Sequence, residues 1–456
     1  MAKNTKYIQI MRSIIDGVQK GRLLPGTKLP PERKMAIDFS VNRSTVVRAL
    51  EELQSLGIVR RKQGSGTYIT ETAAQQQADY VDWRQYLQRE WTTEGQQQLE
   101  QLSQQPGMLD LYTGELPREL IPSFRFPSFD WQEILAAESL QDHRGYQPLI
   151  ETVQHHLQKN FSLQVDTSEI MITSGAQQAI FLILQTMLDP GDVVAVETPS
   201  FLTALPIFHH SGIQTQGISM DDEGIDLAKL EQAILQQKVR MIMVNPNFQN
   251  PTGKTMSLAR RKGLVALARQ YQLPILEDDV FGELAFDQLL PSLKKLDPEN
   301  VLYTGSMSKI LGSSIKVGWL VAPTIIAEKL ASARQMMDFS MSIFPQVLTN
   351  IALTDPAYAR KMAALRLTLS ERAEQMMALF ALQRDWQVDP VNGGYYLWAE
   401  HPQLDAQHVQ QLLQAGLLSA PAELFDSNQR AIRLNFARFS PQDHERFYAI
   451  ISTLKT

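Results

Sequence analysis

The sequence predicts an α/β domain with a mostly parallel sheet, preceded by a small domain of three helices and a β-hairpin. Beyond residue 107, runs rich in Val and Ile alternate with helical stretches such as LARRKGLVALARQY. The four clearest runs are DVVAVETPS, VRMIMVNPN, LPILEDDV and VLYTGS, and each ends in polar residues. The first 70 residues show three amphipathic stretches and a basic, Gly-centred hairpin instead. We call residues 1–70 the head and residues 107–456 the body.

Composition narrows the class of protein. A chain of 456 residues is too long for one compact domain, and its 44% hydrophobic content allows a large core. The absence of cysteine excludes disulfides and thiolate metal sites, and no metal centre is expected. The start lacks the apolar stretch of a signal peptide, and AIFLILQTML is about half a membrane span. We therefore expect a soluble cytoplasmic protein that does not contact a membrane.

The head has the pattern of a winged helix-turn-helix. An amphipathic helix fits Tyr7 to Gln19, and a Pro-Pro pair fits the entry to a short second helix. A third helix is expected from an N-cap at Asn42 to a stop at Gly57. IVRRKQGSGTYIT then predicts two short strands around a Gly-Ser-Gly turn. In this geometry the first turn of the third helix enters the major groove of double-stranded DNA.

The charge of the head fits a polyanionic partner. It carries thirteen Lys/Arg and five Asp/Glu, a net +8, so the rest must carry −14 to give the total of −6. Any one of these side chains taken alone is more simply explained as part of a solvated surface. As a set they predict DNA contacts from Arg33, Arg43, Ser44, Thr45, Arg48, Arg61 and Lys62, with Arg60 beside them on the wing. PGTKLPPERKMA, VNRSTVVRAL and GSGTYI also resemble the GntR family of regulators.

A glutamine-rich stretch separates head and body. Residues 71–106 include ETAAQQQAD and TTEGQQQLEQLSQQPG and are interpreted as a linker. VDWRQYLQREW within it has the spacing of a short docking helix. The body is expected to hold a large subdomain at about 150–325. A small one should combine about 107–149 with 326–456.

Candidate site residues follow the predicted strands of the body, where ligands bind in such sheets. TSGAQQAI offers free backbone N–H groups at a helix start, and TPSF places an aromatic ring beyond a strand. NPNFQNPTG supplies amides, EDDV aspartates and GSMSK a lysine. Singly, these are an ordinary turn, a helix cap and a surface lysine. Together they suit pyridoxal 5'-phosphate (PLP), which needs a Schiff-base lysine, an acid for the pyridine nitrogen and a phosphate cup.

These motifs, with HRGYQPLIETV, NGGYYLW and IRLNFA, resemble the fold-type I aminotransferases, which have a mostly parallel sheet and a smaller C-terminal α+β domain. The resemblance implies that Lys309 forms the Schiff base and that Arg433 holds an effector carboxylate. It further implies cofactor contacts from Asp278 at the pyridine nitrogen, Asn250 at the ring oxygen, Phe201 by stacking, and Gly175, Ala176, Gln177, Ser306, Ser308 and Lys316 at the phosphate. Head and body together resemble the MocR subfamily of GntR regulators.

Three positions depart from the related enzymes. Phe281 replaces a tyrosine whose phenol would reach the ring oxygen, and Lys316 replaces an arginine at the phosphate. Leu140 replaces a tyrosine that reaches the cofactor of the neighbouring subunit. These changes favour a site kept for sensing over one kept for turnover.

We therefore expect a PLP-dependent transcriptional regulator that senses PLP or an amino compound, with a small amine or a vitamin B6 vitamer as effector. The resemblance implies a homodimer, and two heads imply paired operator half-sites. One alternative is an active aminotransferase with an accessory head, which transaminase turnover would reveal. Another is a DNA-binding protein whose body is only a dimerisation scaffold, which would bind no cofactor.

Overall fold

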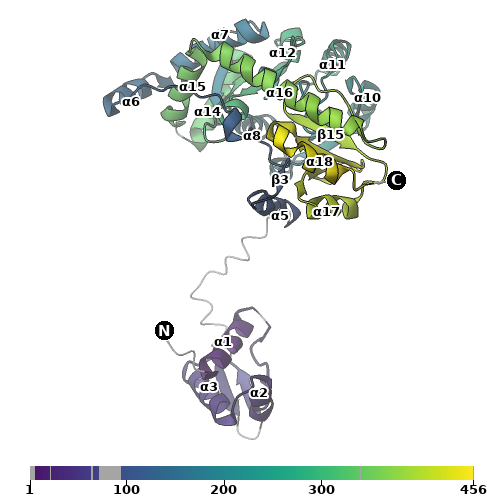
Figure 1. The fold of residues 1–456 in the computed structure, drawn as a ribbon. Coiled ribbons are helices and arrows are strands. Elements are labelled where there is room, and N and C mark those ends of the chain that lie inside the picture. The colour runs from purple at the N-terminus through teal and green to yellow at the C-terminus, as the bar shows by residue number, and fades with distance from the viewer. Residues whose placement is uncertain (1–5, 21, 63–64, 71–93, 339, 455–456) are drawn as a thin grey trace. The chain divides into compact units, whose positions relative to one another are not determined.

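The computed structural model describes residues 6–20, 22–62, 65–70, 94–338 and 340–454. The chain divides into two compact units, residues 1–91 and residues 92–456, which hold the head and the body (Figure 1). The segment VDWRQYLQREW lies outside the described residues. Within the ranges given, no helix combines the length and the apolar character that crossing a membrane demands.

The head folds around its own apolar core. Buried side chains at Ile10 and Ile14 of α1 meet Val46 and Leu50 of α3, as their i, i+4 spacing predicts. Asn42 stands at the N-cap of α3, but its side chain makes no capping hydrogen bond. The elements are α1 (Lys6–Gln19), α2 (Glu32–Asp38), α3 (Arg43–Ser55), β1 (Val59–Lys62) and the antiparallel β2 (Gly66–Ile69). The winged helix-turn-helix expected from the sequence is thus present.

An eight-stranded sheet forms the centre of the body, in the order β6-β13-β12-β11-β10-β7-β8-β9. The run from β12 to β8 is parallel, whereas β13 is antiparallel to both of its neighbours. The strands are β6 (Ile170–Thr173), β7 (Val193–Thr198), β8 (Gln214–Asp221), β9 (Gly224–Ile225), β10 (Val239–Val244), β11 (Ile275–Asp278), β12 (Val301–Ser306) and β13 (Gly318–Val321). The four apolar runs of the sequence are β7, β10, β11 and β12, which confirms the mostly parallel sheet.

Helices cover both faces of this sheet (Figure 1). Val194 and Met241 belong to a buried cluster that includes α8 (Ala176–Met187) and α14 (Thr324–Met337). Their neighbours Val193 and Ile242 point the other way, into a cluster with α10 (Leu227–Gln236) and α11 (Leu258–Gln270). Burial on both faces explains why the strands are continuous apolar runs in the sequence.

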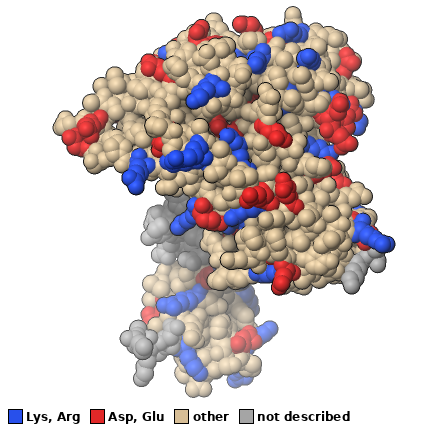
Figure 2. Space-filling view, turned by 45° about the horizontal axis from the view of Figure 1, so that its top comes forward, with Lys and Arg blue, Asp and Glu red and all other residues tan. Residues whose placement is uncertain are grey.

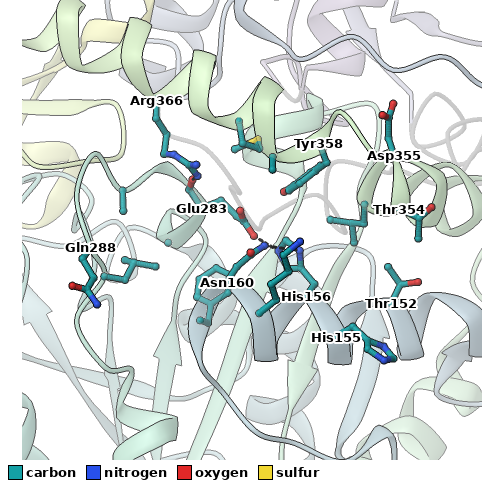
Figure 3. A pocket seen from close by; sticks show the side chains of 18 of the residues that line it. Thr152, His155, His156, Asn160, Glu283, Gln288, Thr354, Asp355, Tyr358 and Arg366 are labelled. Carbon is teal, nitrogen blue, oxygen red and sulfur yellow. Dashed lines mark hydrogen bonds and ion pairs between the residues drawn. The ribbon is translucent and has the colours of Figure 1, made fainter.

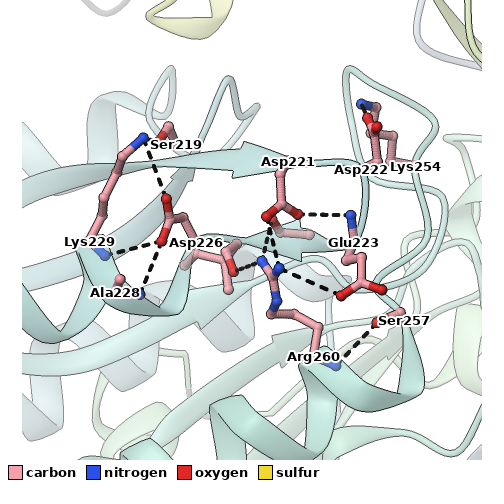
Figure 4. Close-up of polar contacts among 12 residues, drawn as sticks. Ser219, Asp221, Asp222, Glu223, Asp226, Ala228, Lys229, Lys254, Ser257 and Arg260 are labelled. Atoms are coloured by element: carbon pink, nitrogen blue, oxygen red, sulfur yellow. Dashed lines mark hydrogen bonds and ion pairs between the residues drawn. The ribbon is translucent and has the colours of Figure 1, made fainter.

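Polar contacts fix the edge of the sheet at the turn between β8 and β9 (Figure 4). Arg260 of α11 donates from Nη2 to Asp221 at 2.8 Å and from Nη1 to the carbonyl of Gly224 at 3.1 Å. The Asp226 carboxylate accepts from two backbone N–H groups at the start of α10, and Ser257 caps α11 in the same way. These contacts join the starts of α10 and α11 to one edge of the sheet. We therefore assign these polar residues a structural role.

A smaller antiparallel sheet, in the order β14-β15-β18-β17, forms the C-terminal part of the body. A short N-terminal strand, β3, pairs in parallel with β16, so the chain enters the body beside its C-terminal part. The strands are β3 (Leu109–Asp110), β14 (Gln387–Val388), β15 (Tyr396–Glu400), β16 (Leu417–Leu418), β17 (Ala420–Pro421) and β18 (Ala431–Asn435), and β4 (Gln141–Asp142) pairs with β5 (Gly145–Tyr146). The remaining helices are α5 (Glu94–Ser103), α6 (Trp131–Glu138), α7 (Gln147–Phe161), α9 (Pro206–His210), α12 (Leu293–Leu296), α13 (Ser308–Leu311), α15 (Ile343–Thr354), α16 (Tyr358–Ala381), α17 (Ala406–Gln414) and α18 (His444–Ile451).

Two expected boundaries differ from the structure. The end of the expected linker is helical, because Leu99 and Leu102 are spaced to bury one side of α5. The helix α14, most of which was expected in the small subdomain, packs on the large sheet through Ala327 and Leu330. Both differences come from apolar side chains at helical spacing that find a partner surface in the body.

Candidate functional site

Segments from distant parts of the body meet around one cavity of about 310 Å³, beyond the carboxyl ends of the parallel strands. Its walls come from the start of α8, the segment after β7, the ends of β10, β11 and β12, and α13. The lining includes Gly175, Ala176, Gln177, Phe201, Asn250, Asp278, Ser306, Ser308, Lys309 and Lys316, which are all of the sequence candidates in the body except Arg433.

Lys309 lies on α13, directly after β12, and is partly buried. Its Nζ donates a hydrogen bond to the carbonyl of Gly114 at 3.0 Å and lies 5.9 Å from the centre of the Phe281 ring. Such a lysine is not an ordinary surface charge, because its ammonium group is directed into the protein and is held by a backbone acceptor.

Asp278 ends β11 and is almost fully buried. Thr304 donates to its Oδ1 at 3.0 Å, and Asn245 donates from Nδ2 to its carbonyl at 2.6 Å. Burial raises the pKa of Asp278 to about 6, because the charged form is poorly solvated there. A cationic ligand group beside this carboxyl would favour its ionised form.

The start of α8 forms a polar cup opposite the strand ends. Gly175 precedes the helix with φ of 85°, a conformation that favours glycine, and it exposes the free N–H groups of the first turn. Ser306 and Ser308 bring hydroxyls to the same cavity, and the exposed Lys316 adds a positive charge at its rim. Backbone N–H groups, hydroxyls and a cation together are a donor set that suits a phosphate group.

Arg433 stands just outside the cavity lining on β18. Its Nη1 donates to Asn250 Oδ1 at 3.2 Å, and its Nη2 donates to the carbonyl of Tyr112 at 2.6 Å. Its guanidinium lies over the Tyr396 ring at 4.3 Å, and among the described residues its buried Nε has no hydrogen-bond partner. The expected carboxylate-binding arginine therefore contacts one of the cavity residues directly.

Sequence reasoning missed several groups at this site. Asn245 links Asp278 to Asn250 by accepting from the backbone N–H of Asn250 at 3.0 Å, and its place at the end of β10 was a usable signal. Glu115 lines the cavity, and Gly114 accepts from Lys309. Nothing in their segment pointed to this place, since only the fold brings it there.

Two of the positions that depart from the related enzymes, Phe281 and Leu140, lie in different environments. Phe281 is buried with its ring edge-on to Tyr395 and Tyr396, at centroid distances of 5.1 and 5.5 Å. Tyr395 donates its hydroxyl to the Gly114 carbonyl at 3.1 Å, the same acceptor that Lys309 uses. A phenol is thus present near Lys309, although not at position 281. Leu140 is 52% exposed on the surface of the body.

In the head, the DNA-binding candidates are mostly exposed, and basic side chains are visible on its surface in Figure 2. Arg43 and Arg61 both pair with Glu32, at 2.9 and 3.3 Å, which the sequence did not indicate. Arg48 lies over the ring of Tyr7 at 4.3 Å. Arg33, Ser44 and Lys62 are exposed, and Thr45 is half-buried at the start of α3. Glu32 thus holds two of the candidate arginines beside the start of α2.

Comparison with known families gives two matches. Residues 108–451 match the family of aminotransferases of class I and II. Residues 6–69 match the gntR family of bacterial regulatory proteins.

Known proteins resemble either the whole chain or the body. YisV of Bacillus subtilis (strain 168), named as an uncharacterized HTH-type transcriptional regulator, is 31% identical over 96% of this chain and 93% of its own. The HTH-type transcriptional regulator NorG of Staphylococcus aureus (strain N315) is 26% identical over 90% of this chain and 95% of its own.

Among solved structures, kynurenine aminotransferase of Pyrococcus horikoshii has a TM-score of 0.72 and 28% identity, over 83% of this chain and 99% of its own. LysN of Thermus thermophilus, an alpha-aminoadipate aminotransferase, has a TM-score of 0.68 and 26% identity, over 80% of this chain and 95% of its own. The chain therefore belongs to the HTH-type transcriptional regulators that join a GntR-type head to a body of the class I and II aminotransferase family, the arrangement expected from its resemblance to the MocR subfamily.

Proposed function

We propose that the head binds a double-stranded DNA operator in the cytoplasm and that the body binds PLP through Lys309. The body then senses either PLP itself or a small amino compound. The observation that carries the proposal is the single cavity in which Lys309, Asp278, Asn250 and the cup at the start of α8 come together. Two solved neighbours support the cofactor, since their structures hold PMP and a phosphopyridoxyl-leucine adduct.

The donor set of this cavity fits PLP group by group. Asp278 would face the pyridine nitrogen and gain a cationic partner for its buried carboxyl. The N–H groups after Gly175, the two serine hydroxyls and Lys316 would hold the phosphate. When bound, PLP supplies an aldehyde that condenses with a primary amine, and we assign that amine to Lys309, whose Nζ is directed inward whereas Lys316 is exposed.

An effector would act through Lys309 and Arg433. When the Nζ of Lys309 binds a ligand, its hydrogen bond to the Gly114 carbonyl must change. Occupancy of the cavity therefore alters a contact of the segment through which the chain enters the body. A carboxylate on the effector would compete with Asn250 and Tyr112 for the Arg433 guanidinium. The effector must bind the two conformations with different affinity to change operator binding.

We further propose that the body forms a homodimer. Trp131 and Leu135 of α6 are 64% and 42% exposed, and Leu140 after it is 52% exposed. Phe344 of α15, at 46% exposure, lies against Trp131 with ring centroids 6.5 Å apart. An exposed apolar set of this kind favours coverage by a second copy. Sedimentation of the Trp131→Asp variant is expected to show a monomer, and an unchanged dimer would overturn this part of the proposal.

The test of the cofactor site is the visible absorbance of the full-length protein after PLP is added. A new band is expected for the wild type and not for Lys309→Ala. Ser313→Ala, which changes another lining residue, is a matched control and should keep the band. A band of equal strength in Lys309→Ala, or none in the wild type, would overturn the site and leave the body as a scaffold.

A turnover assay of the same full-length protein with PLP distinguishes sensing from catalysis. The preserved Lys309, Asp278 and Asn250 favour an active aminotransferase as the second candidate. We expect turnover with amino donors and keto acids to stay well below about 1 per second, which is slow for an enzyme. Turnover at or above that rate would make catalysis the primary function.

A further inference from the structure

A second cavity of about 780 Å³ lies in the body and shares no lining residue with the Lys309 cavity (Figure 3). One wall is α7, and another is the segment from Gly282 to Leu289, which follows β11. The third wall is the end of α15 with the start of α16. This volume is in the usual range of small-molecule sites.

Three almost fully buried polar side chains converge in this cavity, His156, Glu283 and Tyr358, which are 7%, 8% and 7% exposed. His156 Nε2 hydrogen bonds to Glu283 Oε1, while Asn160 lies 3.0 Å from His156 Nδ1. The histidine and the glutamate therefore have partners in the protein itself.

Tyr358 differs from these two. Among the described residues its hydroxyl makes no hydrogen bond of normal geometry, although Glu283 lies close enough to act on it both through its charge and as a hydrogen-bond acceptor. Burial, and after it the charge of Glu283, raises the pKa of Tyr358 well above its usual range, so the phenol is a neutral donor. A buried hydroxyl that lacks a well-formed hydrogen bond is unfavourable. Its oxygen has almost no exposed surface in the cavity wall, so an acceptor on a ligand would reach the O–H group only after a small movement of the lining.

Charged side chains of both signs line the same cavity. Arg366 donates from Nη1 to the Glu283 carbonyl at 3.1 Å and enters no ion pair within the described ranges. Lys159 and Asp287, both exposed, likewise form no ion pair with any described residue. The cavity therefore offers two cations and one carboxylate that enter no ion pair within the described ranges.

We propose that this cavity is a second ligand site, for a small zwitterion that carries a carboxylate and a protonated amine. Arg366, Lys159 and the Tyr358 hydroxyl take the carboxylate, and Asp287 takes the amine. Binding is non-covalent and does not involve Lys309. The site does not depend on the proposed cofactor.

The probe is N,N-dimethylglycine, a zwitterion whose tertiary amine cannot form a Schiff base with PLP. Its affinity for the full-length protein is measured by NMR titration with the wild type and with Tyr358→Phe, Arg366→Gln and Lys309→Ala. Binding is expected to weaken by about tenfold or more in the first two variants. It should be unchanged in Lys309→Ala. Acetate and tetramethylammonium, which carry one charge each, are expected to bind more weakly than the zwitterion.

Thermal unfolding separates loss of the site from loss of the fold. Without probe, Tyr358→Phe should unfold at a temperature equal to or above that of the wild type, because it removes only an unpartnered hydroxyl. A lower unfolding temperature would show that the hydroxyl has a structural partner and would overturn the proposal. So would binding weaker than about 10 mM in the wild type, loss of binding in Lys309→Ala, or acetate binding as tightly as the zwitterion.

Discussion

One arginine of the head and one arginine of the body lie in opposite environments. In the head, the guanidinium of Arg43 is 61% exposed and shares Glu32 with Arg61. In the body, Arg261 is fully buried and donates to three backbone carbonyls and to Asn247. An exposed charged side chain can bind a partner molecule with little loss of folding stability, whereas the contacts of a buried one contribute to the stability of the fold. Arg43 and Arg261 should therefore respond differently to the same substitution.

The largest effect is expected for Arg261→Ala. This change leaves the buried carboxyls of Glu277, Asp279 and Glu197 without their nearby cation, because Arg261 acts electrostatically on all three. We expect the free energy of unfolding of the body to fall by about 3–5 kcal/mol. Hydrogen exchange followed by mass spectrometry reports peptides of the body and of the head separately, and those of the head should be unchanged.

Arg240→Ala is the matched control for that experiment. Arg240 is 62% exposed and lies 4.0 Å from Asp192, so its loss should lower the free energy of unfolding by less than about 1 kcal/mol. Equal effects of the two arginine substitutions would remove the contrast between buried and exposed charges.

The next largest effect is expected for Arg43→Ala, in the head. Arg43 opens the helix expected in the major groove, so its loss should weaken operator binding by about 1–3 kcal/mol. Electrophoretic mobility shifts at fixed salt measure this effect, and the PLP absorbance band serves as the control. A parallel loss of that band would mean that head and body do not act as separate modules.

A smaller effect is expected from pH. Burial raises the pKa of Glu197 to about 8 and of Glu277 to about 7, whereas a glutamate ordinarily titrates near 4.5. Between pH 6.5 and 8 the folded body therefore binds more protons than the unfolded chain, and its free energy of unfolding falls as pH rises. Each group contributes at most about 1.4 kcal/mol per pH unit.

Urea denaturation at several pH values across that window measures the slope. Glu197→Gln should flatten the upper part of the curve, because this side chain then has no proton to release. A free energy of unfolding that rises from pH 6.5 to 8 would contradict the assignment of these two buried acids.

The smallest effect is expected for Glu32→Gln. The substitution removes the ion pairs to Arg43 and Arg61, whose side chains are 61% and 33% exposed, so the head should lose less than about 1 kcal/mol of stability. Exchange rates of the α3 peptides measure that loss. A loss of stability as large as that of Arg261→Ala would show that the fold of the head depends on Glu32. Exposed and buried charges would then contribute equally to stability.

Sequence reasoning located the Lys309 cavity because its residues follow strands whose apolar runs are unmistakable. Parallel strands end at one edge, so Asp278 after β11 and Lys309 after β12 had to be close. The same reasoning could not supply Gly114, because its place depends on the pairing of β3 with β16. It also missed Glu32, whose contacts with Arg43 and Arg61 arise from packing between α2, α3 and the wing.

The second cavity had no signal in the sequence at all. His156, Glu283 and Tyr358 come from three segments with no common motif, and each is an ordinary residue in its own stretch. Their meeting depends on how α7 and α16 approach the segment after β11. Sites of this kind are visible only when burial and missing hydrogen bonds are known for each side chain.

The pairing of β3 with β16 also sets where force enters the body. The described chain begins this unit at α5 and is then fastened at Leu109 and Asp110, with Arg438 holding the Asp110 carboxylate at 2.9 Å. Tension along the chain from its N-terminal side is therefore borne first by the C-terminal part of the body. Immediately beyond that anchor lies Gly114, which holds Lys309. Because Gly114 lies four residues beyond Asp110, a displacement of the β3–β16 pair would reach the hydrogen-bond acceptor of Lys309 over a short stretch of chain.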